Sequence, residues 1–201
     1  MLAAALVAAC TPAVQGPGVA PAPVSADRPR GAVDVTPRVL ALKNPGFEEE
    51  VRGGARCANG WSCTVHADPA AFRFFAVPGA SGGNQAICTE FVKKEPWAIV
   101  AQGTYDRTLP GTRLRYTLAV RLEGVSGQGA GPWASVQRAG LRSVVHQKLL
   151  KQTAGWETHV LEFDVPDNAT VVEVGLMLRG TGRACLDDAR LEILHASKSP
   201  V

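Results

Sequence analysis

Arg113-Leu-Arg-Tyr-Thr-Leu-Ala-Val-Arg121 alternates apolar and polar side chains with a period of two. Its apolar positions are Leu114, Tyr116, Leu118 and Val120. Successive side chains of a β-strand point to opposite faces, so this pattern predicts a strand with one buried and one solvated face. Other parts of the chain can be interpreted in the same way.

Further alternating runs are separated by turn residues. The runs are Leu161–Val165 and Val172–Arg179, and Arg138–Lys151 is also predicted as a strand because it contains β-branched residues. The turn signals are Leu109-Pro-Gly111, Val165-Pro-Asp-Asn168 and Arg179-Gly-Thr-Gly182. Many short strands joined by turns predict an all-β protein, a two-sheet β-sandwich or jelly roll.

Composition limits the chain to one core. It has 201 residues, of which 46% are hydrophobic and 19% are charged, which favours a single folded domain. The formal net charge is only +3, and no Lys/Arg block is interleaved with aromatic residues. We therefore expect no nucleic-acid partner.

The N-terminal segment resembles a bacterial lipoprotein signal. Residues 1–9 are apolar and small, and Val7-Ala-Ala-Cys10 places a cysteine directly after two small residues. The resemblance implies that Cys10 carries lipid and anchors an exported protein to a membrane of the bacterial cell envelope. The alternatives are an ordinary secretory signal and a chance cysteine.

Residues 10–38 are predicted to form a disordered Pro/Ala-rich tether, since such a composition cannot build a core. The folded domain is predicted to span residues 39–195, and residues 196–201 are predicted to be a disordered tail. If the tether is extended, it holds the domain away from the membrane.

Four cysteines remain after Cys10, an even number that suits an exported protein. The simplest pairing joins Cys57 to Cys63 across a short turn, and Cys88 to Cys185 between two predicted strands. The alternative is a four-cysteine zinc site, but the chain lacks a C-x₂-C pair.

Several short motifs follow one another in a recognisable order. They are Asn44-Pro-Gly-Phe-Glu48, Gly60-Trp61, Val100-Ala-Gln102, Leu109-Pro-Gly-Thr-Arg-Leu-Arg-Tyr116, Gly155-Trp156, Phe163-Asp-Val-Pro166 and Leu186-Asp-Asp-Ala189. In this order they resemble the CenC-type carbohydrate-binding modules, which are galactose-binding-like jelly rolls. The resemblance implies a non-catalytic domain that binds glycan, although one fold can serve many functions.

The first and last of these motifs are expected to meet, because they belong to the first and last strands. Asp187 is predicted to share the inward face of its strand with Cys185 and Ala189, and Asp188 to point outward. The family's structural calcium site is matched by Glu48 and Asp187, so the resemblance implies Ca²⁺ there. The alternative is that Asp187 pairs with backbone amides or with an arginine.

Glycan recognition requires aromatic platforms and polar side chains on a solvated face. Trp97 and Trp133 lie in segments that look like exposed loops, while Trp61 and Trp156 match structural tryptophans of the family. The candidate hydrogen-bonding residues are Arg121, Gln147, Glu173 and Arg179. For each of these, the alternative is an ordinary solvated strand residue.

No catalytic residues are predicted. The four histidines have no metal-ligand spacing, and no serine or cysteine stands in an activating context. The preferred hypothesis is a lipid-anchored glycan-binding module, and the alternative is a module of envelope assembly that binds protein. A glycan binder is expected to present Trp97 or Trp133 beside a polar groove, and an assembly module an apolar patch or an open sheet edge.

Overall fold

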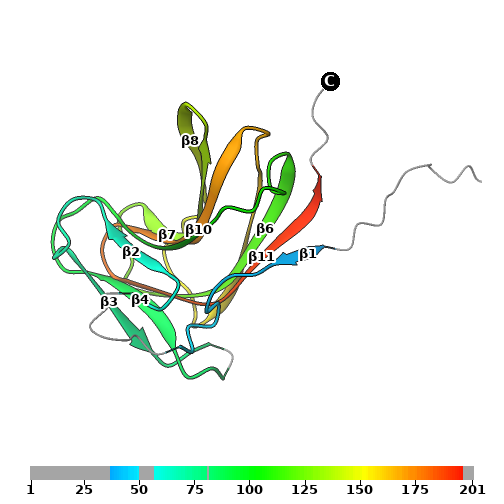
Figure 1. The fold of residues 1–201 in the computed structure, drawn as a ribbon. Helices are drawn as coiled ribbons and strands as arrows, with labels where there is room; N and C mark the ends of the chain where they lie inside the picture. The colour runs from blue at the N-terminus through cyan, green and yellow to red at the C-terminus, as the bar shows by residue number, and fades with distance from the viewer. Residues whose placement is uncertain (1–36, 50–56, 81, 197–201) are drawn as a thin grey trace, which may run out of the picture. The chain divides into compact units, whose positions relative to one another are not determined.

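The computed structural model describes residues 37–49, 57–80 and 82–196, and its secondary structure is all β (Figure 1). Cys10, the signal segment, nearly all of the tether and the end of the tail lie outside the described residues. The strands are β1 (Arg38–Leu40), β2 (Ser62–Val65), β3 (Phe72–Val77), β4 (Ala86–Phe91), β5 (Ala98–Thr104), β6 (Thr112–Glu123), β7 (Gly129–Arg138), β8 (Leu141–Gln147), β9 (Glu157–Asp164), β10 (Ala169–Arg179) and β11 (Arg183–Ala196). None of the described residues forms a helix that could span a membrane.

Two antiparallel sheets pack face to face as a sandwich (Figure 1). The six-stranded sheet has the order β3-β4-β11-β6-β9, with β1 also paired to β11, and the five-stranded sheet has the order β2-β5-β10-β7-β8. The predicted all-β sandwich is therefore confirmed. The first strand and the last strand are neighbours, as expected, with Leu40 opposite Leu191.

The alternation that predicted the strands also supplies the core. Leu114, Tyr116, Leu118 and Val120 of β6 are fully buried and share one hydrophobic core with four residues of β10 in the other sheet. Those residues are Val172, Val174, Leu176 and Leu178. Trp61 joins this core: its ring lies 4.8 Å from Phe47, and its indole N–H donates to the carbonyl oxygen of Lys43. The core therefore stabilises residues 41–49, the entry segment that follows β1, as well as the sheets.

The segment Arg138–Lys151, predicted as one strand, is mostly the second arm of a hairpin. Strand β7 ends at Arg138, Gly140 has a positive φ of 66°, and β8 begins at Leu141. Glycine adopts this left-handed conformation without a steric cost. Gly140 therefore lets the chain reverse where the β-branched pattern alone predicted continuous extension.

The predicted inward register of Asp187 is wrong. Ala184 and Leu186 face the core before this point of β11, whereas Ala189, Leu191 and Ile193 face it afterwards. The pairing with β6 shifts between Asp187 and Arg190, and Asp188 has a positive φ of 48°. This β-bulge inverts the alternation, so Asp187 and Cys185 lie on the outer face.

Both expected disulfides are present. Cys57 bonds to Cys63 within one turn, and Cys88 bonds to Cys185 across β4 and β11, where the two residues are direct partners in the ladder. Because the second bond joins residues 97 positions apart, it restricts the unfolded chain far more than the first, which joins residues 6 apart.

Replacing Cys88 and Cys185 together with Ala is expected to lower the free energy of unfolding by about 4 to 5 kcal/mol, from the chain entropy of a long closed loop. The matched control, replacement of Cys57 and Cys63, is expected to cost only about 2 kcal/mol on the same model. Urea unfolding of the two variants checks this order, and an equal loss in both would contradict it.

His146 of β8 is stacked against Phe163 of β9, with ring centroids 5.2 Å apart. Burial lowers the pKa of His146, and the charge of Asp164 offsets part of that shift. The neutral ring is thus the form that the folded state prefers. The neutral His146 ring contributes to stability above the pKa of about 6.5 that it has in the unfolded chain. This contribution is lost as the pH falls through the lower pKa of the folded state.

His146→Phe keeps the stack and removes the titration, so its melting temperature is expected to fall less between about pH 7 and pH 5 than that of the unaltered protein. Calorimetry at several pH values measures the slope, with His195→Asn as the control that removes a histidine at the end of β11. An unchanged slope in His146→Phe would refute the assignment.

Candidate functional site

A groove of about 610 Å³ lies on the outer face of the five-stranded sheet. It is lined by Ser62, Thr64, Trp97, Ile99, Ala101, Trp133, Ser135, Val145, Gln147, Glu173, Met177 and Arg179. Five of the six residues predicted to bind ligand are among them: Trp97, Trp133, Gln147, Glu173 and Arg179. The structure thus brings together side chains from β7, β8, β10 and the segment before β5.

The floor of the groove is low because its central positions carry small side chains. Gly175 of β10 lies between Ala101 of β5 and Trp133 of β7 in the ladder. A Cβ on Gly175 would lie 2.0 Å from the carbonyl oxygen of Val100, so no larger residue fits there. The indole of Trp133 packs with Ala101 and Met177 and is only 7% exposed.

The expectation of a loop-borne, exposed Trp133 is therefore wrong. Its glycine-rich surroundings belong to strand β7, where Gly129 and Gly131 allow residues 148–150 to approach closely. A Cβ on these glycines would lie 2.4 Å and 2.2 Å from the carbonyl oxygens of Leu150 and Lys148. The glycines thus serve a close backbone contact. The buried indole nitrogen of Trp133 has no hydrogen-bond partner among the described residues.

Trp97 forms one wall of the groove. It lies directly before β5, is half-buried, and packs against the floor residues. His66 meets it edge-on at a centroid distance of 5.5 Å, and the Nδ1 of His66 lies 3.2 Å from the carboxylate of Glu95. These contacts hold the indole in place while part of it stays accessible, an arrangement suited to stacking on a ligand.

The remaining lining residues divide into an apolar floor and polar edges. Ile99, Ala101 and Met177 supply the floor, while hydroxyl and amide groups come from Ser62, Thr64, Ser135 and Gln147. Sequence reasoning missed the two β2 residues and Ser135. The only signal for the two β2 residues is the alternation of polar and apolar residues along residues 62–65, which is too short to distinguish from a turn.

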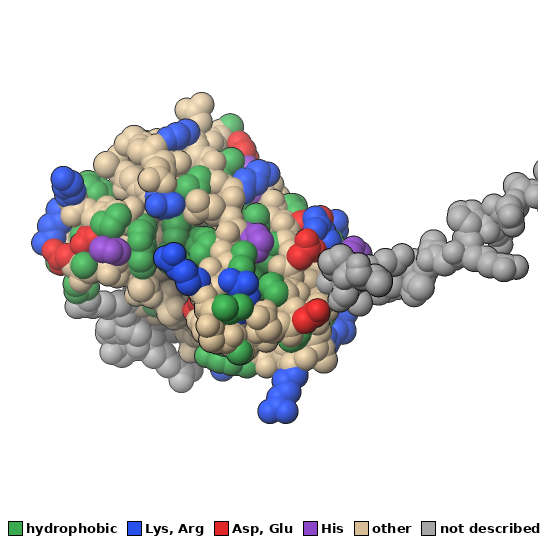
Figure 2. Space-filling model, turned by 90° about the horizontal axis from the view of Figure 1, so that it is seen from above, with side chains coloured by type: hydrophobic (Ala, Val, Ile, Leu, Met, Phe, Trp, Pro, Cys, Tyr) green, Lys and Arg blue, Asp and Glu red, His purple; other side chains and the backbone are tan. Residues whose placement is uncertain are grey.

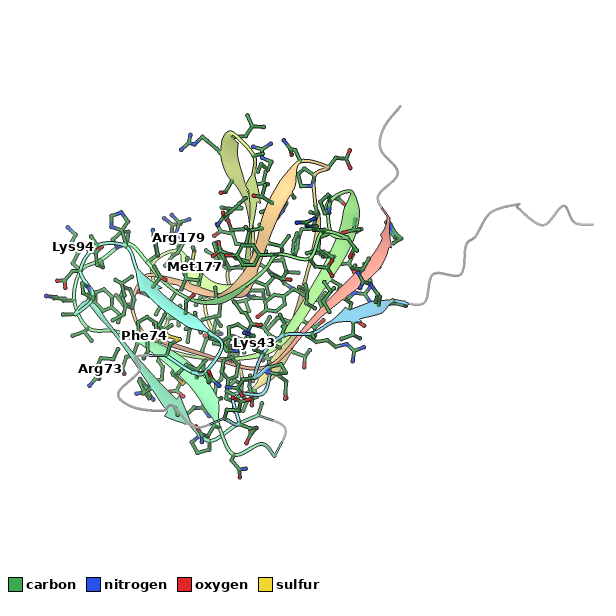
Figure 3. The ribbon with its side chains drawn as sticks, in the orientation of Figure 1. Lys43, Arg73, Phe74, Lys94, Met177 and Arg179 are labelled. Carbon is green, nitrogen blue, oxygen red and sulfur yellow. A yellow bond between two sulfur atoms is a disulfide. The ribbon has the colours of Figure 1, made fainter. Side chains whose placement is uncertain are left out.

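The two charged lining residues stand apart on one strand face. Glu173 receives a long hydrogen bond of 3.4 Å from the side-chain amide of Gln137, and Arg179 follows six positions later on β10. Figure 3 shows Met177 and Arg179 near one another, both from the last part of β10. In the view from above (Figure 2), hydrophobic side chains lie in a hollow with Lys and Arg side chains around them.

Arg121, the sixth predicted ligand residue, is not part of the groove. Strand β6 belongs to the other sheet, so the solvated face of Arg121 is the outer face of the six-stranded sheet. Its guanidinium lies 3.1 Å from the carboxylate of Glu123 and 5.0 Å from the ring centroid of Trp156. The alternation identified the solvated side correctly but could not identify the sheet.

The outer face of the six-stranded sheet has a different character, because its charges are paired. Arg183 bridges Glu90 and Glu123 at 2.9 Å and 3.1 Å. Arg113 and Arg115 in turn hold the carboxylate of Glu162. Exposed ion pairs of this kind contribute only about 0 to 1 kcal/mol each. This face is a solvated surface whose charges already have partners.

Solved structures with the same architecture are carbohydrate-binding modules in several cases. The C-terminal family 22 carbohydrate-binding module of Clostridium thermocellum Xyn10B is 13% identical, with 77% of this chain and 94% of that chain covered and a TM-score of 0.53. The CBM22-1 xylan-binding domain of Paenibacillus barcinonensis Xyn10C is 12% identical, with 82% and 100% covered and a TM-score of 0.59. This chain has the carbohydrate-binding-module jelly-roll fold.

The enzymatically active domain of bacteriophage CBA120 tailspike protein 4 is also similar, at 11% identity and a TM-score of 0.55 over 76% of this chain and 21% of that chain. No protein-family model and no curated protein matches the sequence. Identities this low establish a shared fold and nothing finer. Residue roles in this jelly roll therefore rest on the chemistry of its own groove.

The jelly roll has a second hollow, of about 690 Å³, beside β2 and β3. It is lined by Val65, Phe72, Phe74 and Phe75, together with Arg73, Glu90 and Arg183 among others. Glu90 forms ion pairs with both arginines, so the charged groups of this hollow are already partnered. It also contains no predicted ligand residue, which leaves the groove as the better candidate site.

Glu48 and Asp187 both bind the loop between β3 and β4. The carboxylate of Asp187 accepts hydrogen bonds of 2.7 Å from the amides of Ala80 and Asp188. The carboxylate of Glu48 accepts from the amides of Asn84 and Gln85 at 2.9 Å and 3.2 Å. The loop is therefore fastened to β11 and to the entry segment. The alternative expected from the sequence, in which Asp187 pairs with backbone amides, is therefore observed.

Asp187 is 1% exposed although it faces outward, because this loop lies over it. Burial raises the pKa of Asp187, its two amide hydrogen bonds lower it, and the charges of Asp188 and Glu48 raise it. The amide hydrogen bonds from Asn84 and Gln85 lower the pKa of Glu48. Two neighbouring carboxylates that repel each other favour a cation between them.

The oxygen atoms around Gly79 are of the chemical types that bind calcium. A Cβ on Gly79 would lie 2.9 Å from a carboxylate oxygen of Asp187, 2.8 Å from the carbonyl oxygen of Gly83 and 3.1 Å from that of Gln85. Carboxylate and carbonyl oxygens are the ligands that Ca²⁺ prefers. Within the described residues, no group of three or more His, Cys, Asp or Glu side chains gathers around one point. Any cation here would therefore depend on backbone carbonyls.

Proposed function

We propose that this chain is a non-catalytic module that binds glycan in the groove of its five-stranded sheet. The observation that carries the proposal is the combination of a partly accessible tryptophan wall, Trp97, with an apolar floor and flanking hydroxyl and amide groups. Sugar rings present apolar faces and polar edges, so one ligand can satisfy both parts of the groove.

The similar modules support this reading. One of them is a xylan-binding domain, and another binds its ligand with residues of a cleft. The groove favours glycan binding over the protein-docking alternative, because it is hollowed and carries polar groups at its edges, whereas an assembly module is expected to present a flat apolar patch or an open sheet edge.

We further propose that the module is displayed at a bacterial envelope through a lipid on Cys10, with residues 10–38 as its tether. The motif Val7-Ala-Ala-Cys10 and the two disulfides support an exported protein. Mass spectrometry of the protein from a membrane fraction tests the anchor: a diacylated or triacylated N-terminal cysteine is expected, and an unmodified Cys10 would refute it.

Replacing Trp97 with Ala is expected to weaken glycan binding at least about tenfold, because an aromatic anchor in a binding site contributes about 2 kcal/mol or more. Binding of the intact chain to an array of plant and cell-wall glycans identifies the ligand, and titration calorimetry measures the variant. Trp156→Ala, which alters a tryptophan beside the other sheet, is the matched control and is expected to bind normally.

Two results would contradict the proposal. If no glycan binds with calcium present, the function is wrong. If a glycan binds but Trp97→Ala and Trp156→Ala behave alike, the groove is the wrong site.

We also propose that Glu48 and Asp187 hold a structural Ca²⁺ with the carbonyl oxygens of the β3–β4 loop. The ion would stabilise the fold by neutralising the two carboxylates. Its ligands lie on β11, in the segment after β1 and in the β3–β4 loop, and none of them lines the groove, so the ion would not contact the glycan.

Calcium is expected to raise the melting temperature, and Asp187→Ala is expected both to lower the melting temperature and to remove its dependence on calcium. Differential scanning fluorimetry with calcium and with a chelator measures both effects. Asp164→Ala removes a carboxylate that pairs with Arg113 and serves as the control. Identical melting curves with calcium and chelator would rule out the metal.

A further inference from the structure

Arg179 is a cation without a partner in the groove. Its side chain lines the groove, yet its guanidinium makes no hydrogen bond or ion pair with any described residue, and its Nε is buried. The arginines of the six-stranded sheet behave differently: Arg73, Arg113 and Arg183 each bind carboxylates. Burying an N–H of a guanidinium without an acceptor costs free energy, so Arg179 is suited to a ligand that brings one.

The neighbours of Arg179 keep this end of the groove positive. Gly129 lies opposite Arg179 on β7, and Lys151 donates to the carbonyl oxygen of the nearby Gly127. Glu95, two residues before Trp97, is already bound to His66 and to the amide of Asp68. No carboxylate of the described residues is therefore shown to neutralise the guanidinium.

The single acidic lining residue is at the other end of the groove. Glu173 precedes Arg179 by six residues on one strand, which corresponds to about 20 Å. That separation exceeds the Debye length of about 8 Å at physiological ionic strength. A ligand group beside Arg179 consequently experiences the arginine far more than it experiences Glu173.

We propose that the groove is selective for acidic glycans, and that Arg179 binds the carboxylate of a uronic acid. The inference rests on the proposed glycan-binding function and adds the charge of the ligand. A guanidinium presents two parallel N–H donors that match the two oxygens of a carboxylate, and such charged pairs are stronger than neutral hydrogen bonds. A sulfate ester offers related oxygens, but a carboxylate matches the planar fork better.

The position of Arg179 also fits this ligand. Met177 and the wall formed by Trp97 lie at the same end, so one sugar ring can contact the apolar surface while its carboxylate reaches the guanidinium. The hydroxyl and amide groups of Ser135 and Gln147, on β7 and β8, remain available for the following sugar units. Arg179 would thus select among glycans that the rest of the groove accepts.

The test compares acidic polymers with their neutral counterparts. Glucuronoxylan and polygalacturonate are each used as prepared and after chemical reduction of their carboxylates to alcohols, and dextran sulfate is compared with dextran. Calorimetry or affinity electrophoresis of the intact chain measures the binding. Arg179→Gln is the test variant. Arg142→Gln is the control of equal charge change, because Arg142 is exposed on β8 and does not line the groove.

A uronic-acid polymer is expected to bind, and its reduced form to bind about 10- to 100-fold more weakly, as for the loss of one charged hydrogen-bonded pair. Arg179→Gln is expected to weaken binding of the acidic form by a similar factor and to leave the reduced form unchanged. Arg142→Gln is expected to resemble the unaltered protein. Melting temperatures confirm that both variants are folded.

Four outcomes overturn the inference. If neutral and acidic forms bind equally, or if Arg179→Gln keeps full affinity for the acid, the charge selectivity is wrong. The glycan function still stands if Trp97→Ala weakens binding and Trp156→Ala does not. If dextran sulfate binds through Arg179 as tightly as the best uronic-acid polymer, the carboxylate preference is wrong. If no glycan binds, acidic or neutral, the proposed function itself fails.

Discussion

The sandwich depends on the way one edge of β11 is divided between two partners. Its first part pairs with β4 and its later part pairs with β1, and the bulge at Asp187 and Asp188 lies between them. The amide of Ala189 donates to the carbonyl oxygen of Pro45 at this point. Strand β4 pairs only with residues 183–186 of β11, and β1 and the entry segment pair with the part of the same edge that follows. Backbone groups on this edge of β11 thus find hydrogen-bond partners.

The bulge has consequences on both faces of the sheet. Toward the interior, it lets Leu186 and Leu191 both reach the core although an odd number of positions separates them. Toward the exterior, it places Asp187 under the β3–β4 loop, close to the disulfide of Cys185. A buried carboxylate with amide partners fixes this loop in one position, because any other arrangement leaves polar groups without partners.

The two outer faces differ because of residue size and charge pairing. The six-stranded sheet carries long side chains of both signs, which cover the surface and neutralise one another. The five-stranded sheet has Ala101 and Gly175 in its middle columns, so the surface is low there and higher where Trp97 stands. A concave, mainly apolar surface with an unpaired arginine is better suited to a ligand than the charged face.

The sequence predicted the strands, the core residues and the disulfides because these depend on local periodicity and on a small number of cysteines. Leu114 and Val172 belong to the core whichever strands become neighbours, since apolar alternation alone requires burial of one face. The same alternation placed Glu173 and Arg179 on a solvated side. Glu173 and Arg179 were therefore found, as surface residues, without knowledge of the topology, whereas Trp97 and Trp133 were chosen because their segments resembled loops.

The tertiary structure alone decided which solvated residues face one another. Arg121 and Arg179 have the same local pattern, but β6 and β10 belong to different sheets, so one arginine pairs with Glu123 and the other lines the groove. Likewise, Trp133 is buried because β5 and β10 bring Ala101 and Met177 against its indole, a contact between strands far apart in the sequence. Periodicity records only whether a side chain faces the core or the solvent. Strand pairing is a long-range choice, made by the packing of the whole sandwich.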